Sequence, residues 1–228
     1  MIYRSLAAAA IVAIPATAAS GEVLFYGSEA DFLTQMSNVG YLFEGLEDFE
    51  GNNVGPGNVL ALPGPLEFGT PWVDDLGNGF PTGLSQPNLA ITCSGVDPDN
   101  WPVLLTDGFA GAVTDCVGAN TFAESTNLNF VNGMTGGVSL VLFDLINGGN
   151  ADVAVYDVND TLLATGVASA PFNGAFLGVY SDVAIGRINI QAQNTGGEIL
   201  DNVSMYNIPA PASLGLLALA GLARRRRR

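Results

Sequence analysis

Histidine and lysine are both absent from the 228 residues, and seven arginines supply all of the basic side chains. Without histidine there is no imidazole base for a serine or cysteine nucleophile and no imidazole ligand for zinc. Without lysine there is no Schiff-base amine and no phosphate-gripping P-loop. The chemistry left for catalysis is a pair of carboxylates, as in glycoside hydrolysis.

Basic charge is also almost missing from the middle of the chain. All 22 acidic residues lie between Glu22 and Asp201, where Arg187 is the one basic residue, so this body carries a formal charge of −21. Such a charge repels phosphate backbones and anionic lipids, which excludes nucleic acid as a partner. Divalent cations are the more natural charge partners, because hard ions take carboxylate oxygens.

The acidity does not indicate disorder. Charged residues make up 13% of the chain and hydrophobic residues 48%, so a core can be built. The segment 21–207 has the length of one domain, and no internal repeat or second boundary divides it.

The N-terminal segment 1–20 has the layout of a secretory signal peptide. Arg4 precedes an apolar run from Leu6 to Ile14, followed by Pro15 and five small residues. The alternative, a membrane helix, needs about 20 apolar residues, roughly twice the length of this run. We therefore expect signal peptidase to cleave after Ala18 or Ser20.

The two cysteines are few enough to be paired with each other. In an oxidising compartment, Cys93 and Cys116 are predicted to form a disulfide. The alternative is two buried thiols. A catalytic thiol is not expected, because no histidine is present to lower its pKa.

Sequence patterns predict an all-β fold, specifically a single antiparallel, jelly-roll-like β-sandwich with a short N-terminal helix. Ser28 is a candidate N-cap for a helix of one to two turns whose apolar positions are Ala30, Leu33 and Met36. Beyond residue 87, runs rich in Val, Ile, Phe and Thr alternate with Asn-Gly-type turns. The predicted strands are 22–27, 41–50, 59–62, 88–93, 103–106, 126–131, 137–145, 151–158, 161–167, 175–180, 183–192 and 198–206.

Clustered acids provide candidate calcium ligands. A jelly roll often brings early and late strands together, so Glu47, Asp48 and Glu50 are predicted to meet Asp201 and to share a structural Ca²⁺ ion. The alternative is a solvated strand end. The same acids, above all Glu47 and Glu50, are the candidates for a carboxylate-based hydrolase.

Both tryptophans lie in loop-like surroundings rich in proline and aspartate. An exposed aromatic ring can stack on a sugar, so Trp72 and Trp101 are candidate carbohydrate-binding residues. Burial as loop anchors is the alternative for each of them.

The C-terminal segment 208–228 differs in composition from the rest of the chain. A Pro209-Ala210-Pro211 motif precedes an uncharged apolar run, and the chain ends in a cluster of five arginines, Arg224, Arg225, Arg226, Arg227 and Arg228. A helix over 212–223 rises about 18 Å, short of the ~30 Å hydrocarbon core, so we expect only transient membrane association through residues 212–228. The arginines are expected to stop this end on the cytoplasmic side.

This segment resembles the PEP-CTERM sorting signal of exported bacterial proteins, with Ala210 where the usual motif has Glu. The resemblance implies recognition and processing by an exosortase-type sorting enzyme. It also implies a structural or adhesive protein at the cell surface or in an exopolysaccharide or biofilm matrix, with extracellular polysaccharide as a partner. Because histidine and lysine are absent, we expect this protein not to be an enzyme. A carbohydrate-binding module is the alternative function, and a carboxylate-based hydrolase is the third.

Overall fold

The computed structural model describes residues 21–50, 59–61, 64–73, 79–80, 83–95, 102–106, 114–119, 124–144, 148–193 and 197–209. The predicted signal peptide, Trp101, and the sorting segment from Ala210 onward lie outside the described residues. The predictions made for these segments therefore stay predictions.

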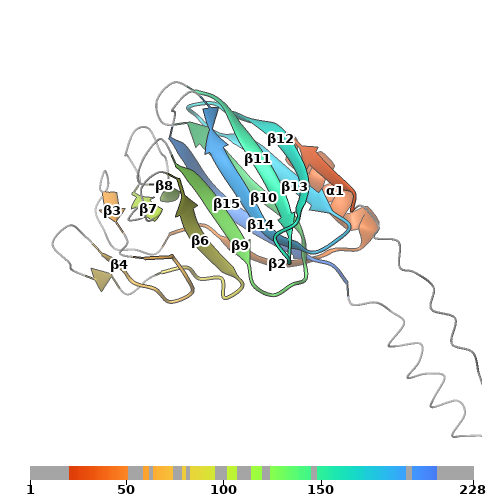
Figure 1. Cartoon of the computed structure of the whole chain (residues 1–228), viewed down its shortest axis with the longest axis horizontal. Helices are drawn as coiled ribbons and strands as arrows, with labels where there is room; N and C mark the ends of the chain where they lie inside the picture. Colours follow the sequence, from red (N-terminus) through yellow and green to blue (C-terminus); the bar gives the residue numbers. More distant parts are fainter. Residues whose placement is uncertain are drawn as a thin grey trace, which may run out of the picture.

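The described chain is built of β-strands and a single helix, in the order seen in Figure 1. The elements are β1 (Val23–Tyr26), α1 (Glu29–Val39), β2 (Leu42–Glu47), β3 (Val59–Ala61), β4 (Trp72–Val73), β5 (Gly79–Phe80), β6 (Leu89–Ser94), β7 (Pro102–Leu105), β8 (Cys116–Ala119), β9 (Ser125–Phe130), β10 (Thr135–Asp144), β11 (Gly149–Asp157), β12 (Leu162–Ala170), β13 (Ala175–Ser181), β14 (Ile185–Ala192) and β15 (Glu198–Asn207). No described helix is long and apolar enough to cross a membrane.

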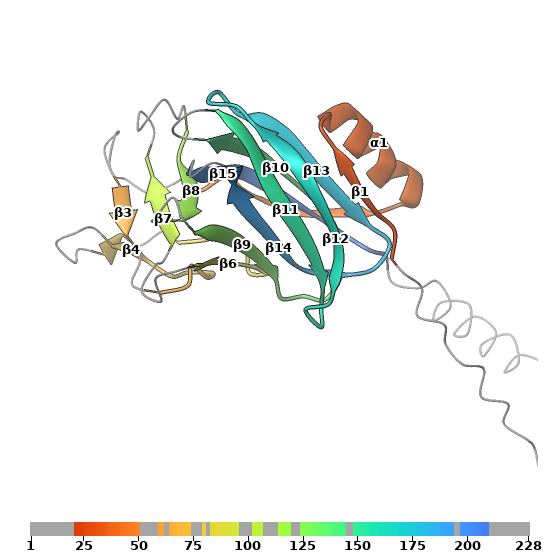
Figure 2. The same cartoon turned by 45° about the horizontal axis from the view of Figure 1, so that its top comes forward.

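Two antiparallel sheets pack face to face, which confirms the predicted all-β sandwich. The larger sheet has eight strands in the order β1-β13-β10-β15-β8-β7-β3, with β2 also paired to β15. The smaller sheet has five strands in the order β12-β11-β14-β9-β6. Figures 1 and 2 show the two sheets as layers, with α1 beside β1 and β13 of the larger sheet.

The core between the sheets follows from the alternation of side chains along each strand. In β11, Val153 and Val155 are buried while Asp152 is exposed, as period-2 patterning predicts for a strand with one wet face. Ile188 and Ile190 of β14 enter the same core, opposite residues of β10 and β15 in the larger sheet. The outward positions of β14 are therefore left to Arg187, Asn189 and Gln191.

The helix α1 covers part of the outer face of the larger sheet. Ser28 caps it by accepting a hydrogen bond from Asp31 N at 3.4 Å, and Gly40 ends it in the left-handed conformation. The cap is as predicted, but the buried residues are Phe32 and Met36, whereas Leu33 is 42% exposed. Of the predicted face, Met36 is therefore right, and Ala30 and Leu33 are wrong. With 11 residues, the helix is also longer than the one to two turns predicted.

Two glycines of the larger sheet allow the helix to approach closely. A Cβ on Gly178 would lie 2.7 Å from the Phe32 ring, and a Cβ on Gly137 would lie 2.3 Å from the Met36 sulfur. The side chains of α1 therefore occupy space that any larger residue on β10 or β13 would fill.

Candidate functional site

The predicted disulfide is not present in the structure. Cys93 lies on β6 of the smaller sheet and Cys116 on β8 of the larger sheet, and they are not bonded to each other. Cys116 packs with Val103, Leu105 and Ile199 in a small separate cluster and donates to Leu105 O at 3.6 Å. Burial raises the pKa of its thiol, so it is a buried, protonated side chain.

Trp72 does not form the exposed sugar platform predicted for it. Its side chain is 1% exposed and belongs to the main core, so no ring face is open to a ligand. The alternative, a buried anchor, is the correct one for this residue. Trp101 lies outside the described residues.

Glu47 is buried and fully engaged in hydrogen bonds. One carboxylate oxygen accepts from Phe49 N at 3.3 Å, and the other accepts from Ser85 N at 2.6 Å, Ser85 Oγ at 3.0 Å and Gln86 N at 3.0 Å. Burial raises the pKa of this carboxyl against those hydrogen bonds. At 1% exposure it ties the loop at residue 85 to β2, and its predicted part in a calcium site or a hydrolytic site stays a prediction.

Asp201 does lie near the end of β2, as predicted. Burial raises the pKa of Asp201 to about 6, and the negative charges of Glu50 and Asp48 act in the same direction. Hydrogen bonds that Asp201 accepts from Thr114 Oγ1 and Asn202 N, both at 2.6 Å, oppose this rise. However, no three His, Cys, Asp or Glu side chains of the described residues form a group that could hold a metal ion. The calcium site predicted at Glu47, Asp48, Glu50 and Asp201 therefore stays a prediction, to be tested by thermal melting with calcium and with chelator.

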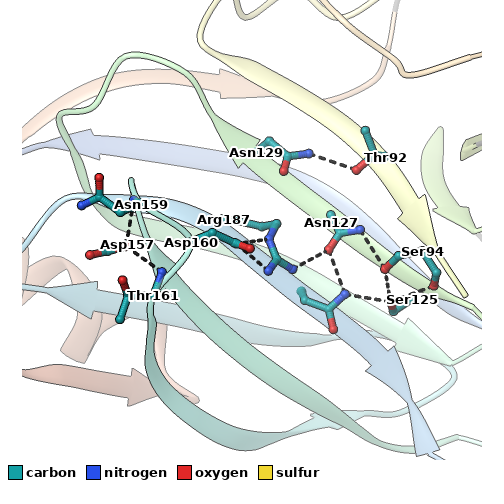
Figure 3. Close-up of polar contacts among 11 residues, drawn as sticks. Thr92, Ser94, Ser125, Asn127, Asn129, Asp157, Asn159, Asp160, Thr161 and Arg187 are labelled. Carbon is teal, nitrogen blue, oxygen red and sulfur yellow. Dashed lines mark hydrogen bonds and ion pairs between the residues drawn. The ribbon is translucent and has the colours of Figure 1, made fainter.

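An extended polar arrangement lies on the outer face of the smaller sheet. Strand register places side chains of β6, β9 and β14 in rows across this face, with Asn189 opposite Asn127 and Asn127 opposite Thr92. We call this surface the amide face and define it as Ser94, Ser125, Asn127, Asn129, Arg187 and Asn189 (Figure 3).

A continuous hydrogen-bond network crosses the amide face, as Figure 3 shows. Asn189 Nδ2 donates to Ser125 Oγ at 2.7 Å and to Asn127 Oδ1 at 2.8 Å. Asn127 Nδ2 donates to Ser94 Oγ at 3.1 Å, which lies 2.9 Å from Ser125 Oγ. Asn127 and Ser125 are themselves buried, so they hold their more accessible neighbours, such as Asn189, in place.

Arg187, the cation of the acidic body, is fixed at one side of this network. Its Nη1 donates to Asn127 Oδ1 at 3.1 Å, while Nε and Nη2 donate to Asp160 Oδ1 at 3.0 and 2.6 Å. The guanidinium carbon also lies 3.7 Å from the centroid of the Tyr156 ring. Because Asp160 neutralises its charge, Arg187 does not make the face an anion site.

The turn between β11 and β12 positions Asp160. Asp157 Oδ1 accepts from Asn159 N and Thr161 N, both at 2.8 Å, and these bonds lower the pKa of Asp157. Asp160 has a φ of 61°, so its side chain leaves the turn toward Arg187. Residues 157–160 therefore form a turn that is capped by the Asp157 side chain.

Beside the amide face, the sheet surface is hollowed. A depression of about 380 Å³ is lined by residues of β11, β12 and β14, among them Asp152, Thr165, Asn189 and Gln191. It forms where the small Ala154 lies between the larger Thr165 and Asn189 in register. The nitrogen of Asn189 is held by the network, and its Oδ1 accepts no hydrogen bond from the described residues.

The depression offers hydrogen-bond donors and acceptors but no free positive charge. Asn189, Gln191 and Thr165 offer both donors and acceptors, and Asp152 offers acceptors. No cation other than the neutralised Arg187 stands on the described part of this sheet. A phosphate or sulfate group would meet an acidic body without a compensating charge.

No family model and no curated protein matches this chain. Among solved structures, it is similar to the CBM22-1–GH10 modules of Clostridium thermocellum endo-1,4-β-D-xylanase 10B complexed with xylohexaose, at a TM-score of 0.36 and 10% identity over 50% of this chain and 26% of that one. It is also similar to the enzymatically active domain of tailspike protein 4 of bacteriophage CBA120, at a TM-score of 0.30 and 15% identity over 53% of this chain and 19% of that one. At such TM-scores these likenesses assign neither fold nor function.

Sequence reasoning missed the amide face. The sequence signal that points to it is the alternation of polar and apolar residues in 126–130 and 187–191. That alternation predicts a wet face on each strand separately, but the pairing of β9 with β14 and β6 is what brings the amides together.

Proposed function

We propose that this chain is an exported, non-enzymatic glycan-binding β-sandwich that serves as a structural or adhesive component of a cell-surface or extracellular polysaccharide matrix. The depression beside the amide face is its proposed binding site, and a neutral polysaccharide is the proposed ligand. The observation that carries the proposal is the prearranged amide and hydroxyl network that ends in Asn189, next to the side chains of Asp152, Thr165 and Gln191.

The hydrogen-bonding groups of the depression match those of a sugar. A sugar hydroxyl both donates and accepts, and so do the amide and hydroxyl side chains of Asn189, Gln191 and Thr165. Because buried Asn127 and Ser125 already hold Asn189, little side-chain entropy is lost when a ligand binds. The apolar side chains of Ala154 and Val167, which also line the depression, suit the carbon face of a sugar ring.

Charge selects among polysaccharides. The body carries −21 because 22 acidic residues face a single arginine, so uronate-rich or sulfated polymers are repelled. Asp152 at the rim of the depression adds to that local repulsion. Neutral polysaccharides are not repelled in this way, so they are the proposed class of ligand.

Export and sorting form the second part of the proposal, and they rest on the terminal segments. We propose cleavage by signal peptidase near residue 20 and processing of residues 208–228 by an exosortase-type enzyme. The intact mass of the mature protein isolated from its natural host tests this. A mass without residues 212–228 is expected, and a mass that retains them contradicts the sorting mechanism.

Binding is tested with an array of neutral and acidic polysaccharides, followed by affinity electrophoresis on those that bind. We expect Asn189→Ala to weaken binding about tenfold or more, because a good hydrogen bond to a bound ligand is worth roughly 1–2 kcal/mol. Asn38→Ala, which removes an exposed amide from α1 on the far side of the sandwich, is the matched control and should bind like the wild type.

Two results would contradict the binding proposal. One is the absence of binding to any neutral polysaccharide on the array. The other is equal binding by wild type, Asn189→Ala and Asn38→Ala, because the depression would then not be the site.

A further inference from the structure

The outer edge of β12 has no strand partner among the described residues. β12 ends the smaller sheet and pairs with β11 alone, and Figure 2 shows it at the margin of the sandwich. No backbone hydrogen bond joins Leu162–Ala170 to a described residue beyond β11. The edge therefore presents a row of backbone N–H and C=O groups that can pair with another strand.

Other ends of the sheets are protected in ways that β12 is not. At the opposite end of the smaller sheet, Leu66 N donates to Ile91 O at 2.9 Å and Ile91 N donates to Leu66 O at 2.8 Å, which covers β6. At one end of the larger sheet, β1 has only four residues, against nine in β12. A long open edge is the kind that pairs most readily.

The composition of β12 also lacks the usual barriers to pairing. Natural edge strands resist association with charges, lysine or proline. No charged residue lies between Asp160 and Asp182, and Leu162–Ala170 contains no proline. The strand therefore adds no charge to a body of charge −21, which comes from 22 acids and one arginine.

A groove runs beside this edge, between the margins of the two sheets. It measures about 240 Å³ and is lined by Phe25, Phe176, Val167 and other residues of β1, β12 and β13. Val167 is 64% exposed and Leu162 is 52% exposed. Apolar side chains are therefore left exposed beside the edge at which a further strand would pair.

We infer that β12 pairs antiparallel with β12 of a second copy of this chain, so that the two smaller sheets form one continuous sheet. A two-fold axis near Gly166 sets Val167 of one copy opposite Thr165 of the other, an isologous contact between uncharged side chains. A second copy is the proposed partner because pairing of the two β12 strands brings only uncharged side chains of these strands together. Contacts through acid-bearing surfaces of two copies would instead be opposed by charge repulsion.

The pairing sets two depressions side by side on one surface, because Thr165 and Val167 line the depression as well as the edge. A long polysaccharide could then engage both sites, and the second contact would gain from a high effective concentration. The dimer itself does not rest on the proposed glycan binding, since self-association is measured without any polysaccharide.

Sedimentation velocity of the full chain, at about 0.15 M salt to screen the acidic bodies, tests the inference. A species of twice the 23.5 kDa chain mass should appear as the concentration rises. Val167→Lys sets a charge against the neutral edge of the second copy and should weaken association about tenfold or more. Val131→Lys, at an equally exposed position (65%) away from β12, is the matched control and should associate like the wild type.

Hydrogen exchange separates this edge from other surfaces of the chain. Backbone amides of Leu162–Ala170 should become protected as the dimer forms. A wild-type chain that stays monomeric overturns the inference. So does a dimer that Val167→Lys and Val131→Lys leave equally intact, or one that forms without new protection in β12.

Discussion

The outer faces of the two sheets differ in what lies on them. On the larger sheet, α1 packs Phe32 and Met36 onto aromatic side chains such as Tyr180 and Tyr206. On the smaller sheet, no described helix or strand covers the outer face, which carries amides, hydroxyls and Arg187 instead. The same period-2 alternation therefore serves stability on one sheet and leaves a polar surface available for ligands on the other.

Removing the central aromatic residue under the helix should have the largest effect on stability. The Phe32 ring is fully buried and lies 5.4–6.0 Å, centroid to centroid, from the rings of Tyr26, Phe176 and Tyr206. We expect Phe32→Ala to lower the free energy of unfolding by about 3–5 kcal/mol, measured by urea denaturation. Leu33→Ala, at the half-exposed next position, should lower the free energy of unfolding by less than about 1 kcal/mol. Equal losses in the two variants would show that the helix does not stabilise the larger sheet through Phe32.

The interior of the sandwich also contains a buried acid, Glu198. Burial raises the pKa of Glu198 from 4.5 to about 7, against hydrogen bonds from Ala192 N at 3.1 Å and Thr126 Oγ1 at 3.0 Å. The folded state therefore holds this proton more tightly than the unfolded state. Its stabilising contribution is complete below about pH 4.5 and is lost as the pH rises toward 7.

We expect the free energy of unfolding to fall by on the order of 3 kcal/mol across this pH window on account of Glu198. The difference between wild type and Glu198→Gln, followed by urea denaturation from pH 4.5 to 8, isolates the effect. Asp201, whose pKa is raised to about 6, acts in the same direction and is present in both proteins. A wild-type stability that rises relative to Glu198→Gln over this range would refute the assignment.

The start of the covering helix should have a smaller effect. Ser28 Oγ accepts from Asp31 N at 3.4 Å, and an alanine leaves that N–H to water. We expect Ser28→Ala to destabilise the fold by about 1 kcal/mol in thermal or urea unfolding, with Ser28→Asp as the variant that restores the cap. Loss in both variants to the same extent would mean that the cap hydrogen bond is not the cause.

The smallest stability effect is expected on the open face. Arg187 pairs with Asp160, whose side chain is 69% exposed, and such pairs contribute little. Arg187→Ala should lower the free energy of unfolding by no more than about 1 kcal/mol. A loss as large as that of Phe32→Ala would show that the amide face supports the fold rather than a ligand.

Much of the architecture could be predicted from the sequence because strands have local sequence signals. β11, β13 and β15 are found close to their predicted bounds, since β-branched and aromatic runs end at Asn- and Gly-rich turns. β8 was not predicted, because Cys116–Ala119 contains a glycine and an alanine and carries little β-propensity.

The sites were harder to predict because they depend on pairing between distant strands. Glu47 was correctly expected near the last strand, yet its hydrogen bonds to Ser85 and Gln86 turn it into an interior support. Cys93 and Cys116 were expected to bond, but they lie on strands of different sheets. No local pattern fixes which side chains end up neighbours across a sheet.

The central claim is that the smaller sheet's depression binds a neutral polysaccharide, and side-chain amide NMR tests it most directly. During titration with the polysaccharide that binds tightest on the array, we expect the side-chain NH₂ resonances of Asn189 and Gln191 to shift. The Asn38 resonances, from α1 on the opposite side of the sandwich, should stay unchanged. Shifts at Asn38 without shifts at Asn189 and Gln191, or no shifts at saturating polysaccharide, would contradict the account.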